Sequence, residues 1–172
     1  MDNSLTADAY RPAGFVAPVQ VTYSVSPIAQ PKITCLDRAR VFALEQAIRD
    51  ELPPVDMPVA HHFSHGVYGR ELRIPAGTVL TGKIHKFDSL NVLLEGELLV
   101  LTDQGVKHVK AGHLEVSPRG TKRAAYALTD TRWLTVHGTH KTDVDDIEAE
   151  FIAQTEQEFL AFCDTQLKLK GE

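Results

Sequence analysis

Residues 82–96, "GKIHKFDSLNVLLEG", contain the end of one short strand and the whole of the next. Polar and apolar residues alternate with the period of two that is typical of strands, and Glu95-Gly96 supplies a turn. Because successive side chains of a strand point to opposite faces, Lys83 and His85 share one face. The stretch therefore predicts two consecutive strands, the first of which carries a Lys and a His on the same side.

The same period continues outward, from His61 to Thr139, as short strands separated by Gly, Pro and Asp turns. Many short strands at regular spacing favour a sandwich or a closed barrel. Residues 36–52 before them have apolar residues at helical spacing, and an acidic segment after them starts a helix near Thr142. We expect an N-terminal arm and helix (1–56), a β-barrel (57–140) and a C-terminal helix (141–172).

Composition sets limits on the class of protein. The 172 residues, of which 43% are hydrophobic, suit one globular domain. No apolar run reaches the roughly 20 residues of a membrane helix, and the N-terminus has no secretory pattern. Cys35 and Cys163 are far apart in the sequence and form no metal-binding or disulfide pattern. We therefore expect a reduced, cytoplasmic protein with no membrane partner.

Charge is distributed unevenly along the chain. Residues 57–142 hold 11 Lys and Arg against 7 Asp and Glu, a net charge of +4, together with all eight histidines. Residues 143–172 hold 2 Lys and 9 Asp and Glu, a net charge of −7. Acidic flanks would repel a long polyanion, so the basic centre fits a small anionic ligand and not a nucleic acid polymer.

Two glycine-rich patterns in this basic centre resemble the cupin superfamily. The first pattern is Gly77-(x)5-Lys83-x-His85-(x)3-Ser89-(x)6-Gly96, and the second is Gly112-(x)5-Pro118-x-Gly120-(x)2-Arg123. The chain is also similar to small cupin proteins encoded by tailed bacteriophages, which would place it in the host cytoplasm. The resemblance implies a mainly β fold: a single cupin (double-stranded β-helix, or jelly-roll) barrel with an N-terminal helical arm and a C-terminal helix.

The resemblance also implies where a metal would bind. Its four ligand positions fall on Lys83, His85, Ser89 and Arg123, and only His85 is a usual ligand. Two fixed cations oppose a divalent ion, so we expect no metal and no cofactor. A site rebuilt from His85 with His137, or with a histidine of residues 61–65, stays open as an alternative.

The substituted positions point to a different ligand. In a cupin barrel Lys83, His85 and Arg123 would face the interior, where two cations favour an anion such as a carboxylate or phosphate. We expect Tyr68 and Arg70 to share one strand face, and Trp133 and His137 to share another, as further ligand-binding residues. Alternatively, a barrel carboxylate neutralises Lys83 or Arg123. The candidates for that role are Glu71, Glu95 and Glu115.

Three functions remain open from the sequence. The first is a metal-free cupin that binds, and would sequester, a small anionic molecule of a phosphorylated or nucleotide-like kind. The second is an isomerase, lyase or hydrolase with His85 or His137 as acid or base. The third is a structural or protein-interaction cupin with an internally paired barrel. The Phe-rich C-terminal segment has more apolar surface than one small barrel face needs. We therefore expect a homodimer or larger homo-oligomer.

Overall fold

The fold is described by a computed structural model over residues 35–102 and 105–170. The N-terminal arm before Cys35 lies outside the described residues. The described residues belong to one unit, Pro31–Glu172. In chain order the elements are α1 (Cys35–Glu51), β1 (Val59–Ser64), β2 (Val67–Ile74), β3 (Val79–Thr81), β4 (Ile84–His85), β5 (Ser89–Glu95), β6 (Glu97–Thr102), β7 (Gly105–Lys110), β8 (Leu114–Ser117), β9 (Ala124–Ala127), β10 (Thr131–Gly138), α2 (Val144–Phe151), β11 (Ile152–Ala153) and α3 (Glu156–Lys170).

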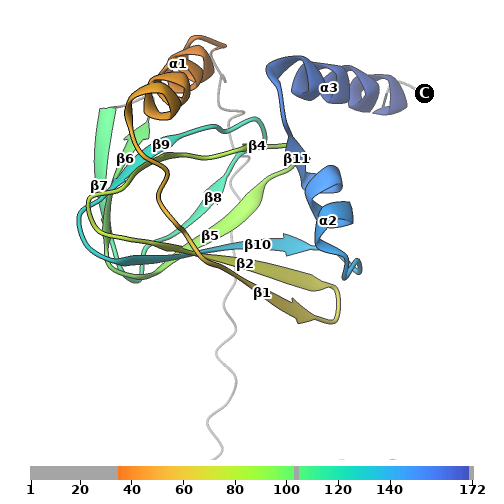
Figure 1. Cartoon of the computed structure of the whole chain (residues 1–172). Coiled ribbons are helices and arrows are strands. Elements are labelled where there is room, and N and C mark those ends of the chain that lie inside the picture. Colours follow the sequence, from red (N-terminus) through yellow and green to blue (C-terminus); the bar gives the residue numbers. More distant parts are fainter. Residues whose placement is uncertain (1–34, 103–104, 171–172) are drawn as a thin grey trace, which may run out of the picture. The chain divides into compact units, whose positions relative to one another are not determined.

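Two antiparallel sheets enclose the interior (Figure 1). One sheet has five strands in the order β1-β2-β10-β5-β8, and the other has four in the order β3-β9-β6-β7. Strands far apart in the sequence are neighbours: β10 lies between β2 and β5. The predicted mainly β fold, with a helix before the strands and a helical C-terminal segment after them, is confirmed.

An apolar core fills one end of the barrel. Its fully buried members come from both sheets and are Ile74, Leu93, Leu98, Val100, Val109 and Ala127. Leu93 is 0% exposed, and burial of such a side chain contributes about 1.5–3 kcal/mol. The core lies where β2 ends and β10 begins, since Ile74 pairs with Thr131.

Turn geometry explains the glycines of the two patterns. Gly96 has a φ of +85°, and a Cβ there would collide with the carbonyl oxygen of Asp130. Gly120 has a φ of +77°, and its Cβ would lie 2.5 Å from the ring of Phe159. Both positions therefore need glycine for backbone conformation and for space.

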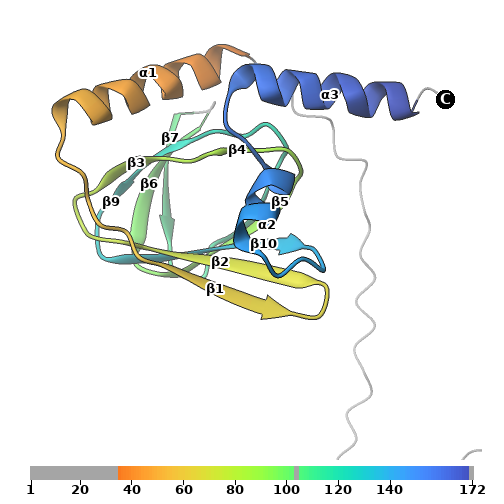
Figure 2. The ribbon, with the colours of Figure 1, turned by 45° about the vertical axis from the view of Figure 1, so that its right-hand side comes forward.

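Helix α1 is fastened to the barrel and to α3 by buried cations. Lys122 Nζ lies 2.8 Å from a Glu45 carboxylate oxygen and 4.6 Å from the centroid of the Phe42 ring. Arg38 Nε donates to Glu156 of α3 at 2.7 Å, and Arg38 Nη1 donates to the carbonyl of Gly120 at 3.0 Å. Figure 2 shows α1 and α3 on the side of the barrel opposite the β1–β2 hairpin.

The C-terminal segment forms two helices where the sequence predicted one. Asp143 caps α2 by accepting from the Asp146 N–H at 3.0 Å. The helix ends at Phe151 because Ile152 is extended and pairs with His85 of β4. Thr155 then accepts from the Glu158 N–H and starts α3. No described helix is both long and apolar enough to span a bilayer.

Candidate ligand-binding site

Three rings stack at the end of the barrel away from the apolar core. Tyr68 of β2 and His137 of β10 are register partners, with ring centroids 6.3 Å apart and planes 14° apart. His137 stacks in turn on His85 of β4, at 5.4 Å and 20°. Phe151 of α2 lies 4.4 Å from His137, centroid to centroid, so α2 covers this ring cluster. The structure thus brings together Tyr68, His85 and His137, three of the residues predicted from the sequence to belong to a site.

The two imidazoles are neutral at pH 7. Burial, followed by the charges of His137, Arg70 and Lys83, lowers the pKa of His85 to about 4. Burial and the charge of Arg70 likewise lower the pKa of His137 to about 4. The Nδ1 atom of each ring is buried, and no described residue hydrogen-bonds to it. Such unpaired nitrogens cost about 1–3 kcal/mol each.

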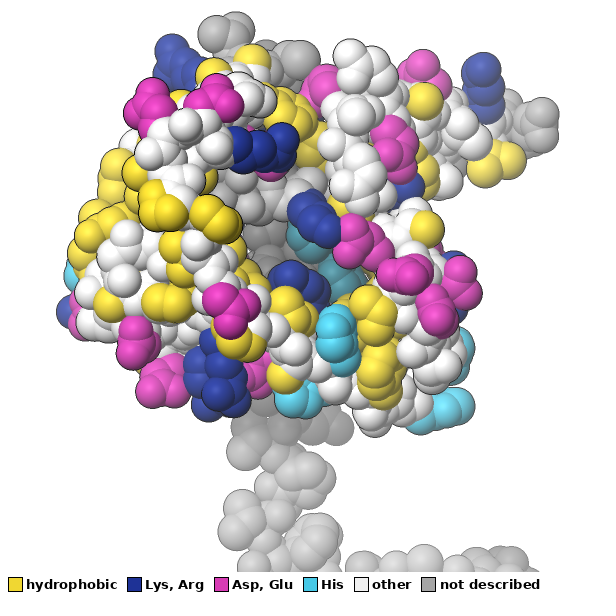
Figure 3. Space-filling view, viewed as in Figure 1, with side chains coloured by type: hydrophobic (Ala, Val, Ile, Leu, Met, Phe, Trp, Pro, Cys, Tyr) yellow, Lys and Arg dark blue, Asp and Glu magenta, His cyan; other side chains and the backbone are white. Residues whose placement is uncertain are grey.

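Arg70 is the cation that belongs to this cluster. It lies two residues from Tyr68 on the same face of β2, and its charge acts on His85, on His137 and on Glu148. Within the described part of the chain, Arg70 makes no hydrogen bond or ion pair. Figure 3 shows this face of the molecule hollowed at its centre, with basic and His side chains in the hollow. Arg70 therefore places a positive charge beside both imidazoles, with no ion pair to it among the described residues.

Lys83 is not placed as the sequence predicted. It precedes β4, is 51% exposed, and forms an ion pair with Glu148 of α2. The hydrogen bond from Lys83 lowers the pKa of Glu148. Gly82 and Lys83 lie between β3 and β4, so Lys83 is not part of a strand, although its charge acts on His85. Lys83 stands at the rim of the ring cluster, already neutralised.

Arg123 is paired by one of the three carboxylates that the alternative prediction named. It forms an ion pair with Glu115, and the two side chains are 27% and 19% exposed. Burial raises the pKa of Glu115, but the charge of Arg123 and the hydrogen bond from His113 lower it below its usual value. The structure therefore does not bring Lys83 and Arg123 together as two unpaired cations.

Trp133 takes part in a polar network inside the barrel. Its Nε1 donates to Asn91 Oδ1 at 3.2 Å, and Thr135 Oγ1 donates to the same oxygen at 2.8 Å. Asn91 Nδ2 donates to Ser117 at 3.0 Å and to Ser89 at 3.3 Å. Because these partners satisfy one another, Trp133 acts as a link between the polar network and the apolar core, against which it packs.

The donor set at the four family metal positions does not fit a divalent ion. Lys83 and Arg123 are cations in ion pairs, and Ser89 contacts Asn91. Among the described residues, no three His, Cys, Asp or Glu side chains are grouped as a metal would need. His85 and His137 alone supply two imidazoles, fewer than the three protein ligands usual for zinc.

Two residues of the site were missed from the sequence. Asn91 could have been found, because a polar residue stands at an inward position of β5 between Ser89 and Leu93. Glu148 could not have been found from the sequence, because it lies 65 residues from Lys83. Its helix contains several acidic residues, and no local pattern distinguishes the one that reaches Lys83. Long-range contacts of this kind depend on how α2 docks.

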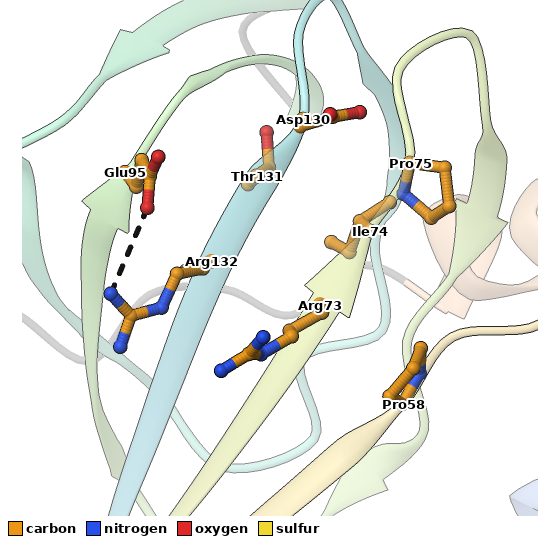
Figure 4. Close-up of a pocket in the computed structure, with 8 residues that line it drawn as sticks. All are labelled: Pro58, Arg73, Ile74, Pro75, Glu95, Asp130, Thr131 and Arg132. Atoms are coloured by element: carbon orange, nitrogen blue, oxygen red, sulfur yellow. Dashed lines mark ion pairs between the residues drawn. The ribbon is translucent and has the colours of Figure 1, made fainter.

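A second recess lies on the outer surface near the apolar end of the barrel (Figure 4). It has a volume of about 340 Å³, and Arg73 and Arg132 line it from adjacent strands. Arg132 Nε donates to the buried Glu71 at 2.7 Å, and Arg73 lies 3.7 Å from the same carboxylate. Because both cations already have a carboxylate neighbour, this recess is a weaker candidate than the ring cluster.

No protein-family model and no curated protein sequence matches the chain. Among solved structures, a cupin superfamily protein from Desulfitobacterium hafniense is 14% identical, with 52% of this chain and 83% of that one covered and a TM-score of 0.42. An RmlC-like cupin with a double-stranded β-helix fold from Methanocaldococcus jannaschii is 18% identical, covering 49% and 82%, with a TM-score of 0.41. A cupin domain from Bordetella pertussis is 18% identical, covering 51% and 98%, with a TM-score of 0.40.

Proposed function

We propose that this protein is a metal-free cupin that binds a small anionic molecule at the ring-cluster end of the barrel. Arg70 would neutralise the anion, and the imidazoles of His85 and His137 would hydrogen-bond to it. Tyr68 would pack against the non-ionic part of the ligand. Lys83 and Arg123, proposed from the sequence as the main cations, take a lesser part because each has a carboxylate partner.

The unpaired guanidinium of Arg70 is the observation that carries this proposal. A partly buried cation that forms no ion pair among the described residues is costly, although the charge of Glu148 acts on it, and it lies beside two imidazoles whose Nδ1 atoms lack partners in the described part of the chain. An anion would offset both costs, since Arg suits carboxylate and phosphate groups and a neutral imidazole can donate one hydrogen bond. A ligand carrying carboxylate or phosphate is therefore the chemical class that the site favours.

The test uses the full chain with inorganic phosphate, sulfate, a small dicarboxylate, a nucleoside monophosphate and a sugar phosphate. Thermal melts and titration calorimetry of wild type should show that at least one of these anions binds and stabilises. Arg70→Met should weaken binding by about 1.5–3 kcal/mol, roughly ten- to a hundred-fold, while leaving the unliganded protein as stable as wild type or more so.

Arg73→Met is the control variant. Arg73 lies on the same strand but on the opposite face, so its removal subtracts the same charge without touching the ring cluster. It should bind anions as wild type does. A wild type that is indifferent to every anion would retire the proposal, as would an Arg70→Met variant that binds as well as wild type.

The same geometry favours a second function, an isomerase, lyase or hydrolase acting on the bound anion. Two imidazoles with a pKa of about 4 are neutral at pH 7, so either can accept a proton from a substrate held by Arg70. Incubation with each anion followed by NMR distinguishes the two functions. Unchanged ligand supports binding alone, whereas turnover that His137→Gln abolishes supports catalysis.

A further inference from the structure

Among the described residues, the charged groups that act on the two imidazoles of the ring cluster leave one positive charge uncompensated. Arg70 acts on both imidazoles and forms no ion pair with a described residue. Lys83 also acts on the cluster, but Glu148 of α2 pairs with it and cancels its charge. Glu150 is likewise cancelled by Lys141, whose Nζ lies 3.1 Å from its carboxylate. In these five residues three cations face two carboxylates, so the net charge is +1.

The other polar groups of the barrel interior do not change this net charge. Arg123 is paired with Glu115, so the two charges cancel. His85 and His137 are buried in their neutral form, and the Nδ1 atom of each ring has no hydrogen-bond partner among the described residues. A neutral imidazole can donate one hydrogen bond without adding a charge. A ligand therefore meets one positive charge and two uncharged hydrogen-bonding rings.

Apolar rings lie beside these polar groups. Tyr68 packs with Ile147 and Phe151 in a buried cluster. Its hydroxyl lies 2.7 Å from His61 Nδ1 and adds no charge, because burial raises the pKa of Tyr68. Phe63 is the register partner of Tyr68 on β1, with ring centroids 5.2 Å apart, and it is 45% exposed. An exposed aromatic ring thus adjoins the ring cluster, and the apolar body of a ligand would pack against it.

We propose that the ligand of this site is a monocarboxylate with an apolar body, and that the site discriminates against dianions such as phosphate monoesters; this rests on the proposed function and narrows it to one class of anion. A single carboxylate neutralises the net charge of the site, and its two oxygens can accept from the Arg70 guanidinium and from the imidazoles. A dianion would leave one negative charge uncompensated beside Glu148. That charge would also lose hydration in a partly buried place, which opposes binding.

Glu148 is the residue that sets this preference. Its carboxylate accepts from Lys83 and from Gln154 Nε2, the latter at 3.1 Å, so it is held at the rim of the ring cluster. The hydrogen bond from Lys83, together with the charges of Lys83 and Arg70, lowers the pKa of Glu148, which is therefore ionised at pH 7. Without this carboxylate three cations would face one, a balance that suits a dianion. Glu148 thus acts as a specificity-determining residue through charge.

Titration calorimetry of the full chain with benzoate, benzenesulfonate and phenyl phosphate tests the proposal. The last two share a phenyl body and a tetrahedral head, but at pH 8 the sulfonate carries one negative charge and the phosphate nearly two. At that pH wild type should bind benzoate and benzenesulfonate at least about ten-fold more tightly than phenyl phosphate. Between pH 8 and 6 the phosphate takes up a proton with a pKa of about 6, so its affinity should rise about five-fold. Benzenesulfonate keeps one charge and corrects for any change in the charge of the protein, including that of His61.

Two variants of α2 separate the role of Glu148 from that of negative charge in general. Glu148→Gln should raise the affinity for phenyl phosphate about ten-fold and that for benzenesulfonate about three-fold. Asp145→Asn removes an exposed carboxylate from the first turn of the same helix and should change neither affinity. Circular dichroism melts establish that each variant is folded, and the pH series on wild type decides the matter if Glu148→Gln is not.

The outcomes distinguish this proposal from the proposed function. The preference for a monocarboxylate is overturned, and anion binding stands, if any dianion binds wild type at pH 8 as tightly as benzenesulfonate does. It is also overturned if Glu148→Gln leaves the ratio of the two affinities unchanged. A wild type that binds no anion of either charge retires both.

Discussion

The two ends of the barrel interior differ in the polarity of the side chains that fill them. At one end Leu93 and its neighbours form a core without polar atoms. At the other, Tyr68, His85 and His137 stack beside Arg70, and two of the imidazole nitrogens have no partner within the described part of the chain. Burial stabilises the first end without a polar cost, whereas at the second the packing of Tyr68 against Ile147 and Phe151 is opposed by the burial of unpaired nitrogens. The second gives up stability to keep polar groups unpaired, which is expected of a site that a ligand completes.

The largest expected effect is at the apolar end. Leu93→Ala should lower the free energy of unfolding by about 2–5 kcal/mol, because Leu93 is 0% exposed and its removal leaves a cavity. Chemical denaturation measures the loss. Leu94→Ala is the control: the neighbouring leucine points outward and is 40% exposed, so its loss should stay below about 1 kcal/mol. Equal losses would mean that the two faces of β5 are wrongly assigned.

The next effect is the response of stability to pH at the ring-cluster end. The folded pKa of His85 and of His137 is about 4, against an ordinary value of 6.5, so the unfolded chain binds more protons between these values. Stability is therefore complete above pH 6.5 and falls as the pH drops towards 4. The slope approaches about 1.4 kcal/mol per pH unit for each histidine.

Urea denaturation between pH 7.5 and 5 measures this slope before most carboxylates titrate. Replacement of one histidine, as in His137→Gln, should roughly halve it. Stability that is flat from pH 7.5 to 5 would show that the imidazoles are not buried in their neutral form.

A smaller effect is expected from removal of an unpaired nitrogen. His137→Phe replaces a 6% exposed imidazole by an apolar ring against Phe151 and Tyr68. Stability at pH 7 should be unchanged or higher by about 1 kcal/mol, since His137 Nδ1 has no hydrogen-bond partner among the described residues and a desolvated nitrogen is removed. Anion binding should be weakened. A loss of 2 kcal/mol or more would mean that His137 makes an interaction that the structure does not show.

The smallest effect concerns the rim of the site. Glu148→Gln removes the carboxylate that neutralises Lys83 and that also acts on Arg70. The anion would then compete with no internal carboxylate, and its affinity should rise about three- to ten-fold. Because the pair is half exposed, the stability of the unliganded protein should change by less than about 1 kcal/mol. Asp145→Asn, at an exposed position of the same helix, is the control, and weaker binding by Glu148→Gln would refute this role.

Much of the fold could be predicted from local pattern. The alternation along β2 and β10 places Tyr68 with Arg70 and Trp133 with His137 on shared faces, and the register confirms both pairs. The glycines at 96 and 120 mark turns because no other residue fits their backbone. These features depend on neighbours in the chain, and a sequence records them directly. The break of the C-terminal segment at Ile152 was missed because it depends on pairing with β4.

The sequence by itself determined the barrel, its flanking helices and the set of basic and histidine side chains available to a ligand. Tertiary structure decided which of those side chains are free. Glu115 and Glu148 reach Arg123 and Lys83 through strand pairing and helix docking, whereas no carboxylate pairs with Arg70 among the described residues. The physical reason is that an ion pair forms at distances of a few ångströms, and residues so close in space can be separated by any length of chain.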